Sequence, residues 1–205
     1  MRNDTPNPFN ALRFVTSAND AGGYPSGAAR EVAFAGRSNA GKSSAINAIA
    51  GRRALAHVSR TPGRTRLINF FTLGADDACA PRIVDLPGYG FAAVNRKTKE
   101  HWEDFLASYV AERDNLVGVV MVSDARHALA DADRNMLHFL ETHHRPALVL
   151  LTKSDKLSRS EAARVLARVR AELAPNRHVR VELFSATSGT GVETARGAIA
   201  AWLTE

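Results

Sequence analysis

The stretch from Gly36 to Ser43 constrains the fold of this 205-residue chain more than any other. It reads Gly-Arg-Ser-Asn-Ala-Gly-Lys-Ser and fits G-x-x-x-x-G-K-[ST], a loop whose backbone N–H groups curl around phosphate oxygens. The apolar run Val32–Ala35 precedes it as a buried strand would, and a helical segment from Ser44 to Ala50 follows. Because a helix N-terminus also attracts anions, this context favours a phosphate-binding loop (P-loop) over a glycine-rich turn with an exposed lysine.

Strand and helix patterns alternate along most of the chain, which is typical of a mainly parallel sheet with helices on both faces. We predict strands at 31–35, 67–73, 82–85, 116–122, 147–151 and 179–184. The short connection between 67–73 and 82–85 favours an antiparallel pair. The sequence thus predicts an α/β fold, in which ligands bind at the carboxyl ends of the strands.

Composition is that of an ordinary globular protein, with 45% apolar and 23% charged residues. We expect residues 1–10, which are polar and rich in Pro and Asn, to be a disordered tail, and 11–205 to form a single domain. A single cysteine, Cys79, excludes an internal disulfide, and no apolar run is long enough to span a membrane. With no signal peptide either, we expect a cytoplasmic protein. The net charge of +6 suggests a polyanionic partner, although a solubilising surface would also explain it.

Asp85-Leu86-Pro87-Gly88 matches the D-x-x-G box of GTPases and follows a predicted strand. Asp85 is expected to hold Mg²⁺ through water, and the Gly88 N–H to contact the γ-phosphate, which only glycine can approach closely enough. In the P-loop, Lys42 is expected to reach the β- and γ-phosphates and Ser43 to bind Mg²⁺.

Two later stretches point to guanine. Thr152-Lys153-Ser154-Asp155 resembles the [NT]-K-x-D box, in which the Asp155 carboxylate accepts hydrogen bonds from two guanine donors that adenine lacks in that arrangement. Ser185-Ala186-Thr187, after Phe184, matches S-A-[KT], in which the Ala186 N–H meets the guanine O6. Thr152 replaces the commoner Asn, and its shorter side chain predicts a reduced tie to the P-loop. A P-loop kinase or ATPase would leave Asp155 and Ala186 unexplained.

Together these motifs resemble the EngB-type (YihA/YsxC) GTP-binding proteins of the Era-like group of bacterial GTPases. The resemblance extends from about residue 12 to the C-terminus. It is carried by Glu31–Ser44, Thr61-Pro62-Gly63-Arg64-Thr65, Asn69-Phe70-Phe71, Asp85–Gly90, Asp124-Ala125-Arg126-His127 and Thr152–Lys156.

The resemblance implies a Ras-like P-loop GTPase with a six-stranded, mostly parallel sheet and one antiparallel edge strand. It implies GTP hydrolysis with Mg²⁺, a role in large ribosomal subunit assembly and a link to cell division and septation. Expected partners are GTP or GDP and ribosomal RNA or the large subunit; membrane and DNA are not expected, and the protein should be a monomer. Expected GTP-binding residues are Gly36, Arg37, Ser38, Asn39, Ala40, Gly41, Lys42, Ser43, Ser44, Gly63, Arg64, Thr65, Asp85, Leu86, Pro87, Gly88, Thr152, Lys153, Ser154, Asp155, Phe184, Ser185 and Ala186.

Thr65 is the switch-loop candidate for Mg²⁺ and γ-phosphate contact, with Thr61 as its competitor. Lys42, Thr65, Gly88 and Asn39 are the candidate catalytic residues.

Tyr89 stands where Ras-type enzymes place the Gln that orients water, so slow intrinsic turnover is predicted. Potassium-activated members of the Era-like group carry Asn at the position of Asn39. K⁺ is therefore a second candidate cofactor, and a purely loop-stabilising role for Asn39 remains the alternative. Another possibility is a nucleotide-gated RNA- or ribosome-binding module whose unstimulated hydrolysis is negligible.

Overall fold

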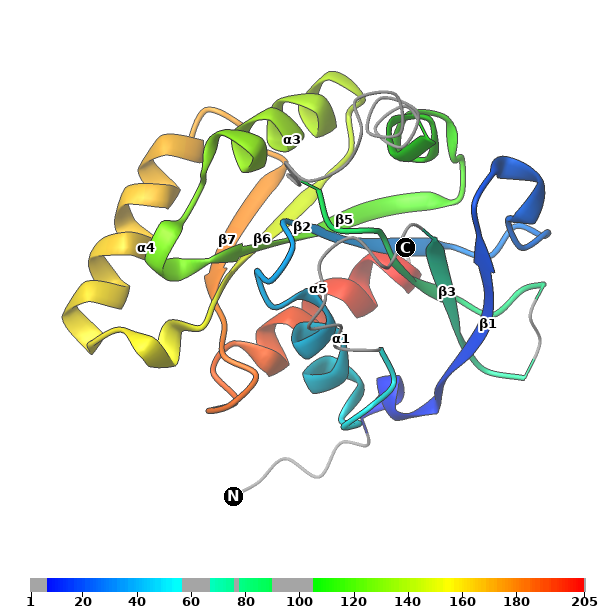
Figure 1. Cartoon of the computed structure of the whole chain (residues 1–205), viewed down its shortest axis with the longest axis horizontal. Helices are drawn as coiled ribbons and strands as arrows, with labels where there is room; N and C mark the ends of the chain where they lie inside the picture. The colour runs from blue at the N-terminus through cyan, green and yellow to red at the C-terminus, as the bar shows by residue number, and fades with distance from the viewer. Residues whose placement is uncertain (1–6, 57–66, 76–77, 90–104, 205) are drawn as a thin grey trace.

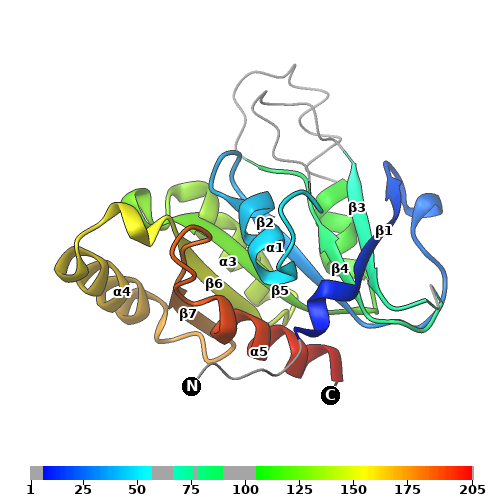
Figure 2. The same ribbon diagram turned by 90° about the horizontal axis from the view of Figure 1, so that it is seen from below.

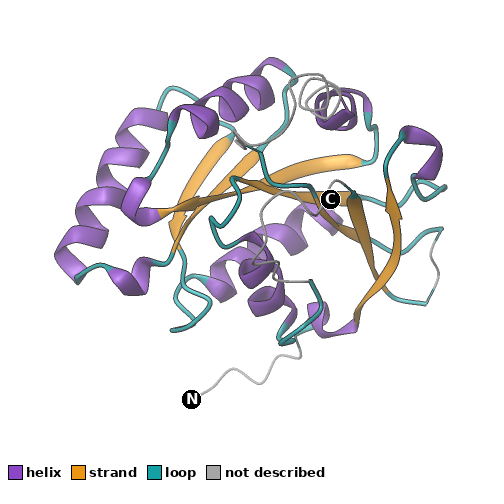
Figure 3. Cartoon of the chain, viewed as in Figure 1, coloured by secondary structure: helices purple, strands orange, loops and turns teal. Residues whose placement is uncertain are grey.

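A seven-stranded sheet forms the centre of the molecule, and helices cover both of its faces (Figures 1 and 3). The computed structural model describes residues 7–56, 67–75, 78–89 and 105–204. Its strands are β1 (Leu12–Ala18), β2 (Glu31–Gly36), β3 (Ile68–Leu73), β4 (Arg82–Asp85), β5 (Leu116–Asp124), β6 (Ala147–Thr152) and β7 (Val179–Leu183). Its α-helices include α1 (Lys42–Ala50), α3 (Asp131–Thr142), α4 (Arg159–Leu173) and α5 (Val192–Thr204), and residues 105–112 are also helical.

The strand order is β1-β3-β4-β2-β5-β6-β7, and β4, β2, β5, β6 and β7 run parallel. The predicted α/β fold and the antiparallel β3–β4 pair are confirmed. The predicted count of six strands is wrong by one, because β1 adds a seventh. Among the strands of the described residues, only β3 is reversed, and it is not at the edge as predicted, since β1 pairs with its outer side in an antiparallel register.

Successive residues of the central strands face opposite sides of the sheet, and both sides are buried. On β2, Ala33 and Ala35 belong to the core beneath α3, α4 and the 105–112 helix, while Val32 and Phe34 belong to the core beneath α1 and α5. Figure 2 shows α1 and α5 together on one side of the sheet. This explains why these strands are continuous apolar runs in the sequence.

The predicted disordered tail, residues 1–10, needs correction at its end. Residues Pro8–Ala11 form a 3-10 turn capped by the Asn7 side chain, which accepts a hydrogen bond from Phe9 N. Phe9 is only 1% exposed and packs in the core shared with α1. The buried aromatic ring attaches this segment to the domain; residues 1–6 lie outside the described part.

The chain crosses from β4 on one side of β2 to β5 on the other. Such a reversal opens a crevice at the carboxyl ends of the strands, where α/β proteins bind ligands. Across the described part of the chain, no helix combines the length and apolarity that a membrane span requires.

Candidate functional site

The loop between β2 and α1 has the curled backbone that the P-loop motif predicts. Asn39 and Gly41 both have positive φ, 64° and 102°, and Ala40 N donates to Arg37 O at 3.0 Å. Helix α1 begins at Lys42 with Gly41 as its N-cap. Because glycine has no side chain with which to cap the helix, the first amides of α1 are left to face an anion in the loop.

The segment after β4 packs directly on this loop. Leu86 N donates to Phe34 O at 3.0 Å, and Tyr89 N donates to Gly36 O at 3.2 Å. A Cβ added to Gly88 would lie 2.7 Å from Ser38 Oγ and 3.2 Å from Ser38 N, so a side chain at this position would collide with the P-loop. The Lys42 ammonium and the Asp85 carboxylate form an ion pair, which brings Asp85 into the same cradle.

The segment after β6 is tied to the P-loop from its other side. Thr152 Oγ1 donates to Ala40 O at 2.5 Å and lies 3.2 Å from Ser123 O. Lys153 Nζ donates to Asn39 O at 2.7 Å. The Thr152 side chain, although shorter than that of Asn, therefore still reaches the P-loop, because the threonine backbone lies close to the loop.

Asp155 is held in place by the segment after β7. Ser185 Oγ donates to Asp155 Oδ1 at 2.6 Å and accepts from Thr187 N and Ser188 N at 3.2 and 3.1 Å. The Ser185 hydrogen bond lowers the pKa of the Asp155 carboxyl from its ordinary value. Ser154 completes the junction, since its N and Oγ both donate to Phe184 O. An ionised, oriented carboxylate thus lies at this end of the site.

The structure brings together four of the predicted stretches, Gly36–Ser44, Asp85–Gly88, Thr152–Asp155 and Phe184–Ala186, at the carboxyl ends of β2, β4, β6 and β7. The predicted residues Gly63, Arg64 and Thr65 lie outside the described residues, as does Thr61.

Comparison with known proteins agrees with this geometry. The family model described as 50S ribosome-binding GTPase matches residues 31–153. A probable GTP-binding protein EngB from Azoarcus sp. (strain BH72) is 48% identical over 197 residues, covering 95% of this chain and 92% of that protein. A second, from Thiobacillus denitrificans (strain ATCC 25259 / T1), is 49% identical over 195 residues, with the same shares covered. The chain belongs to the EngB family of GTP-binding proteins.

Solved structures agree with the fold of an EngB protein. The crystal structure of a probable GTP-binding protein EngB superimposes with a TM-score of 0.66 at 22% identity, covering 84% of this chain and 98% of that one. The structure of Era in complex with MgGDPNP and a 16S ribosomal RNA fragment gives a TM-score of 0.69 at 19% identity, covering 86% and 57%. At these identities the likeness concerns the fold alone. Family membership makes the chain a GTP-binding protein of the GTPase class, a class that generally uses Mg²⁺.

Two carboxylates in this EngB site had no role assigned from the sequence. Asp124, at the end of β5, accepts from Arg126 Nη2 at 2.7 Å and pairs with Lys153 Nζ at 2.9 Å. Burial raises the pKa of the Asp124 carboxyl, but the hydrogen bonds from Arg126 and Lys153 outweigh it and hold the pKa well below its usual range. Asp124 thereby orients Lys153. The sequence shows Asp124 just after a predicted strand, three residues before His127, but it does not show that Asp124 pairs with Lys153.

The second is Asp133, a fully buried carboxylate on α3. It lies on the same helical stripe as Leu137 and Leu140, at i, i+4 and i+7, and an acid on an apolar stripe is a readable signal of a buried polar contact. Tyr89, the residue in place of the Ras-type Gln, donates its hydroxyl to Asp133 Oδ1 at 3.0 Å. Burial, and then the Asp133 charge, raise the pKa of the Tyr89 phenol well above its ordinary value.

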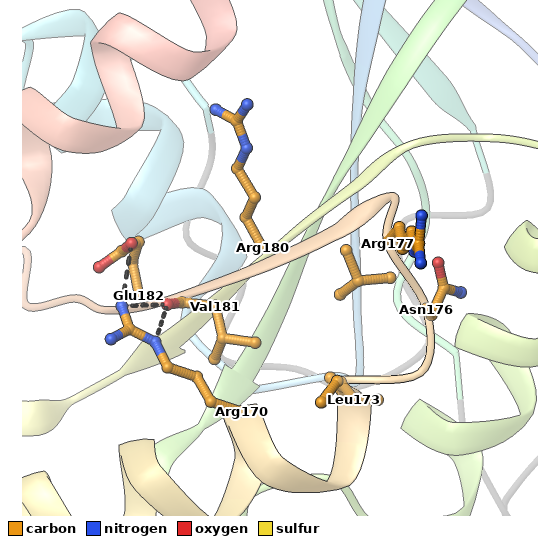
Figure 4. A pocket seen from close by; sticks show the side chains of 9 residues that line it. Arg170, Leu173, Asn176, Arg177, Arg180, Val181 and Glu182 are labelled. Carbon is orange, nitrogen blue, oxygen red and sulfur yellow. Dashed lines mark hydrogen bonds and ion pairs between the residues drawn. The ribbon is translucent and has the colours of Figure 1, made fainter.

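A surface pocket of ≈ 340 Å³ lies apart from these residues (Figure 4). It is lined by the end of α4, the following turn and β7, and the lining residue Arg170 donates from Nε and Nη2 to Val181 O. Figure 4 shows Arg170 and Arg180 on opposite sides of β7. Because the pocket includes the first residues of β7 and the nucleotide motifs follow strand ends, it is not part of the candidate site.

Proposed function

We propose that this chain is a GTP-dependent switch that binds GTP and GDP in the site described above and acts in assembly of the large ribosomal subunit. The observation that best supports the nucleotide assignment is a pair of hydrogen bonds, from the Thr152 and Lys153 side chains to the P-loop carbonyls of Ala40 and Asn39. These hydrogen bonds join a phosphate cradle to the segment that contains Asp155. A ligand that reaches both ends has a phosphate chain and a base.

In this proposal Asp155 accepts hydrogen bonds from guanine N1–H and the exocyclic amine, and the Ala186 N–H donates to O6. The Ser185 hydrogen bond orients one Asp155 oxygen, so the carboxylate pays little ordering entropy when the base binds. The remaining expected GTP contacts, including Gly63 and Arg64, belong to the proposal on the family resemblance.

The test replaces the Asp155 carboxylate by an amide. Asp155→Asn should lose affinity for GDP and gain affinity for xanthosine diphosphate, because xanthine presents a carbonyl where guanine presents the amine. Asp131→Asn, the same change on an exposed α3 residue, is the matched control and should leave both affinities unchanged. An Asp155→Asn protein that still prefers GDP, measured by isothermal titration, would refute the base-recognition assignment.

The donor set of the cradle fits Mg²⁺, which prefers hard oxygen ligands such as hydroxyls, carboxylates and water. Ser43 and Thr65 would bind the ion directly and Asp85 through water, with the Asp85 carboxylate already directed into the cradle by its ion pair with Lys42. When bound, Mg²⁺ would neutralise charge on the β- and γ-phosphates. Lys42 would then exchange Asp85 for phosphate oxygens.

We propose slow intrinsic hydrolysis, because the Tyr89 hydroxyl is engaged by Asp133 and a phenol does not replace the water-orienting amide of Gln. The same contact favours the second candidate function, a nucleotide-gated ribosome- or RNA-binding module with negligible unstimulated turnover. Single-turnover hydrolysis with and without ribosomal particles separates the two, since only the switch should be accelerated.

Asn39 carries the proposed K⁺ dependence. It lies within the P-loop in a left-handed backbone conformation, and its side-chain oxygen is the candidate ligand for a monovalent cation. Turnover should be faster in K⁺ than in Na⁺, with Mg²⁺ present in both. Equal rates would leave Asn39 with a loop-stabilising role.

The ribosomal role is supported by the family description and by the net charge of +6, which suits a phosphate-rich partner. Participation in cell division and septation, a cytoplasmic location and a monomeric state remain predictions of the family resemblance. Sedimentation with ribosomal subunits, in GDP and in a non-hydrolysable GTP analogue, tests the partner. Co-sedimentation that is absent in both states would contradict it.

A further inference from the structure

A buried hydrogen-bond network joins the D-x-x-G segment to α3. Asp133, 0% exposed, accepts from Tyr89 OH at 3.0 Å, from Ser123 Oγ at 2.9 Å and from Ala130 N at 3.3 Å. Ser123 Oγ in turn accepts from Leu129 N at 3.2 Å. Asp133 thus gathers donors from the end of β5, the start of α3 and the residue that follows Gly88.

The P-loop contributes a charged group beside the same carboxylate. Arg37 Nε lies 3.5 Å from Asp133 Oδ2, and this buried nitrogen has no hydrogen-bond partner among the described residues. The backbones of Arg37 and Tyr89 also form a parallel bridge, and Ser38 N lies 3.4 Å from Tyr89 O. Asp133 therefore accepts a hydrogen bond from Tyr89 and lies close to Arg37 of the P-loop, so it contacts both segments of this junction.

We propose that Asp133 is a positioning residue for the γ-phosphate side of the site. By accepting the Tyr89 hydroxyl, it holds Leu86–Tyr89 against the P-loop in the arrangement that places Gly88 beside Ser38. This inference rests on the proposed function, in which the Gly88 amide is the γ-phosphate donor. Gly88 and Ser38 approach each other closely in this arrangement, since a Cβ added to Gly88 would lie 2.7 Å from Ser38 Oγ and 3.2 Å from Ser38 N.

The anchoring should discriminate between nucleotides. A contact within the protein changes the affinity for a ligand only if it stabilises the conformation that binds this ligand relative to other conformations. The proposed contact of Leu86–Tyr89 with the nucleotide is to the γ-phosphate, which GDP lacks. Loss of the anchor should therefore weaken triphosphate binding and leave diphosphate binding unchanged.

The test is Tyr89→Phe, which keeps the buried ring and removes only the hydroxyl. We expect affinity for the β,γ-imido analogue of GTP to fall about tenfold, because a hydrogen bond to a charged group changes an equilibrium constant by roughly that factor or more. Affinity for GDP should stay within about twofold. Equal losses for both nucleotides would reduce Asp133 to a general structural role, and no loss for either would also overturn the proposal.

The matched control is Tyr109→Phe. Tyr109 is also buried and donates its hydroxyl to a buried carboxylate, Glu31 Oε2 at 2.9 Å, at the opposite end of β2. The analogue-to-GDP affinity ratio should not change in this variant. A ratio shifted as far as in Tyr89→Phe would show that loss of any buried phenol hydroxyl suffices, and would overturn the inference.

A double-mutant cycle assigns the effect to Asp133 itself. Asp133→Asn replaces an acceptor that faces only donors by an amide that brings two donors of its own. If Tyr89 acts through Asp133, the change in affinity ratio caused by Asp133→Asn already contains the change caused by Tyr89→Phe. The double variant should then have the same affinity ratio as Asp133→Asn alone. Additive changes in the ratio would show that the two residues act independently. If the unmodified chain binds neither nucleotide, the proposed function itself fails. If it binds GDP normally and Tyr89→Phe leaves the ratio unchanged, only the positioning inference fails.

Discussion

Thr152→Val tests how much one hydroxyl contributes to holding the base-recognition segment on the P-loop. Thr152 is 3% exposed, and its Oγ1 donates to Ala40 O at 2.5 Å with Ser123 O at 3.2 Å. Valine has the same shape but no donor. The change costs about 1 kcal/mol for the hydrogen bond and about 1 kcal/mol for the buried carbonyl left without that donor. We expect the free energy of unfolding to fall by about 2 kcal/mol.

The chain offers the same substitution with the opposite expected sign. Thr72, on β3, is 0% exposed, and its Oγ1 has no hydrogen-bond partner among the described residues. On folding, the Thr72 hydroxyl loses its hydrogen bonds to water and forms none among the described residues, and Thr72→Val removes this hydroxyl. It should raise the free energy of unfolding by about 1 kcal/mol. The two variants match in chemistry, volume and burial, so only the hydrogen bond distinguishes them.

Urea unfolding followed by far-ultraviolet circular dichroism measures both variants. With a slope of about 2 kcal/mol per molar urea, the midpoint should move down by about 1 M for Thr152→Val and up by about 0.5 M for Thr72→Val. Saturating GDP should stabilise Thr152→Val less than the unmodified chain, because ligand stabilisation follows affinity and the altered residue holds the loop. Equal midpoint shifts of the same sign would refute the reasoning, since hydrogen-bond status would then not determine the outcome.

Three further variants probe other parts of the structure. Ser185→Ala removes the hydrogen bond that lowers the Asp155 pKa, so that pKa should rise. Because GDP binding needs the ionised carboxylate, binding measured from pH 7 downward should be lost at a higher pH than in the unmodified chain. Loss of binding at the same pH in both proteins would contradict this. Glu31→Gln leaves the buried Arg82 and partly buried Arg113 without their shared carboxylate, and should cost about 4 kcal/mol, or about 10 °C in Tm, while the GDP affinity of the folded protein is retained. A Tm within about 2 °C of the unmodified chain would show that the cluster contributes little. Gly118→Ala places a Cβ 2.6 Å from the Trp202 ring, and calorimetry should show a loss of about 1–3 kcal/mol, whereas an unchanged Tm would mean that α5 adjusts freely.

Much of the fold and the site could be predicted because their determinants are contiguous in the sequence. Each central strand is an apolar run buried on both faces, and each motif follows directly after such a run. Strand β1 could not be predicted in the same way. Its burial alternates poorly, its register shifts between Phe14 and Thr16, and its partner β3 lies some fifty residues away. An edge strand of this kind is defined by its pairing, which local pattern does not contain.

Thr152 and Asp133 show a second limit, which concerns partners rather than elements. The expectation for Thr152 was drawn from side-chain length alone, but whether a hydroxyl reaches a carbonyl depends on where the two backbones lie, and Ala40 is 112 residues away. Asp133 was not predicted, although an acid on the same helical stripe as Leu137 and Leu140 is a pattern from which a buried polar contact can be inferred. Only the crossover of the sheet brings Tyr89, 44 residues earlier, to that carboxylate. A motif therefore names the groups that meet the ligand, whereas the residues that hold those groups in place are determined by topology and must be found in the structure.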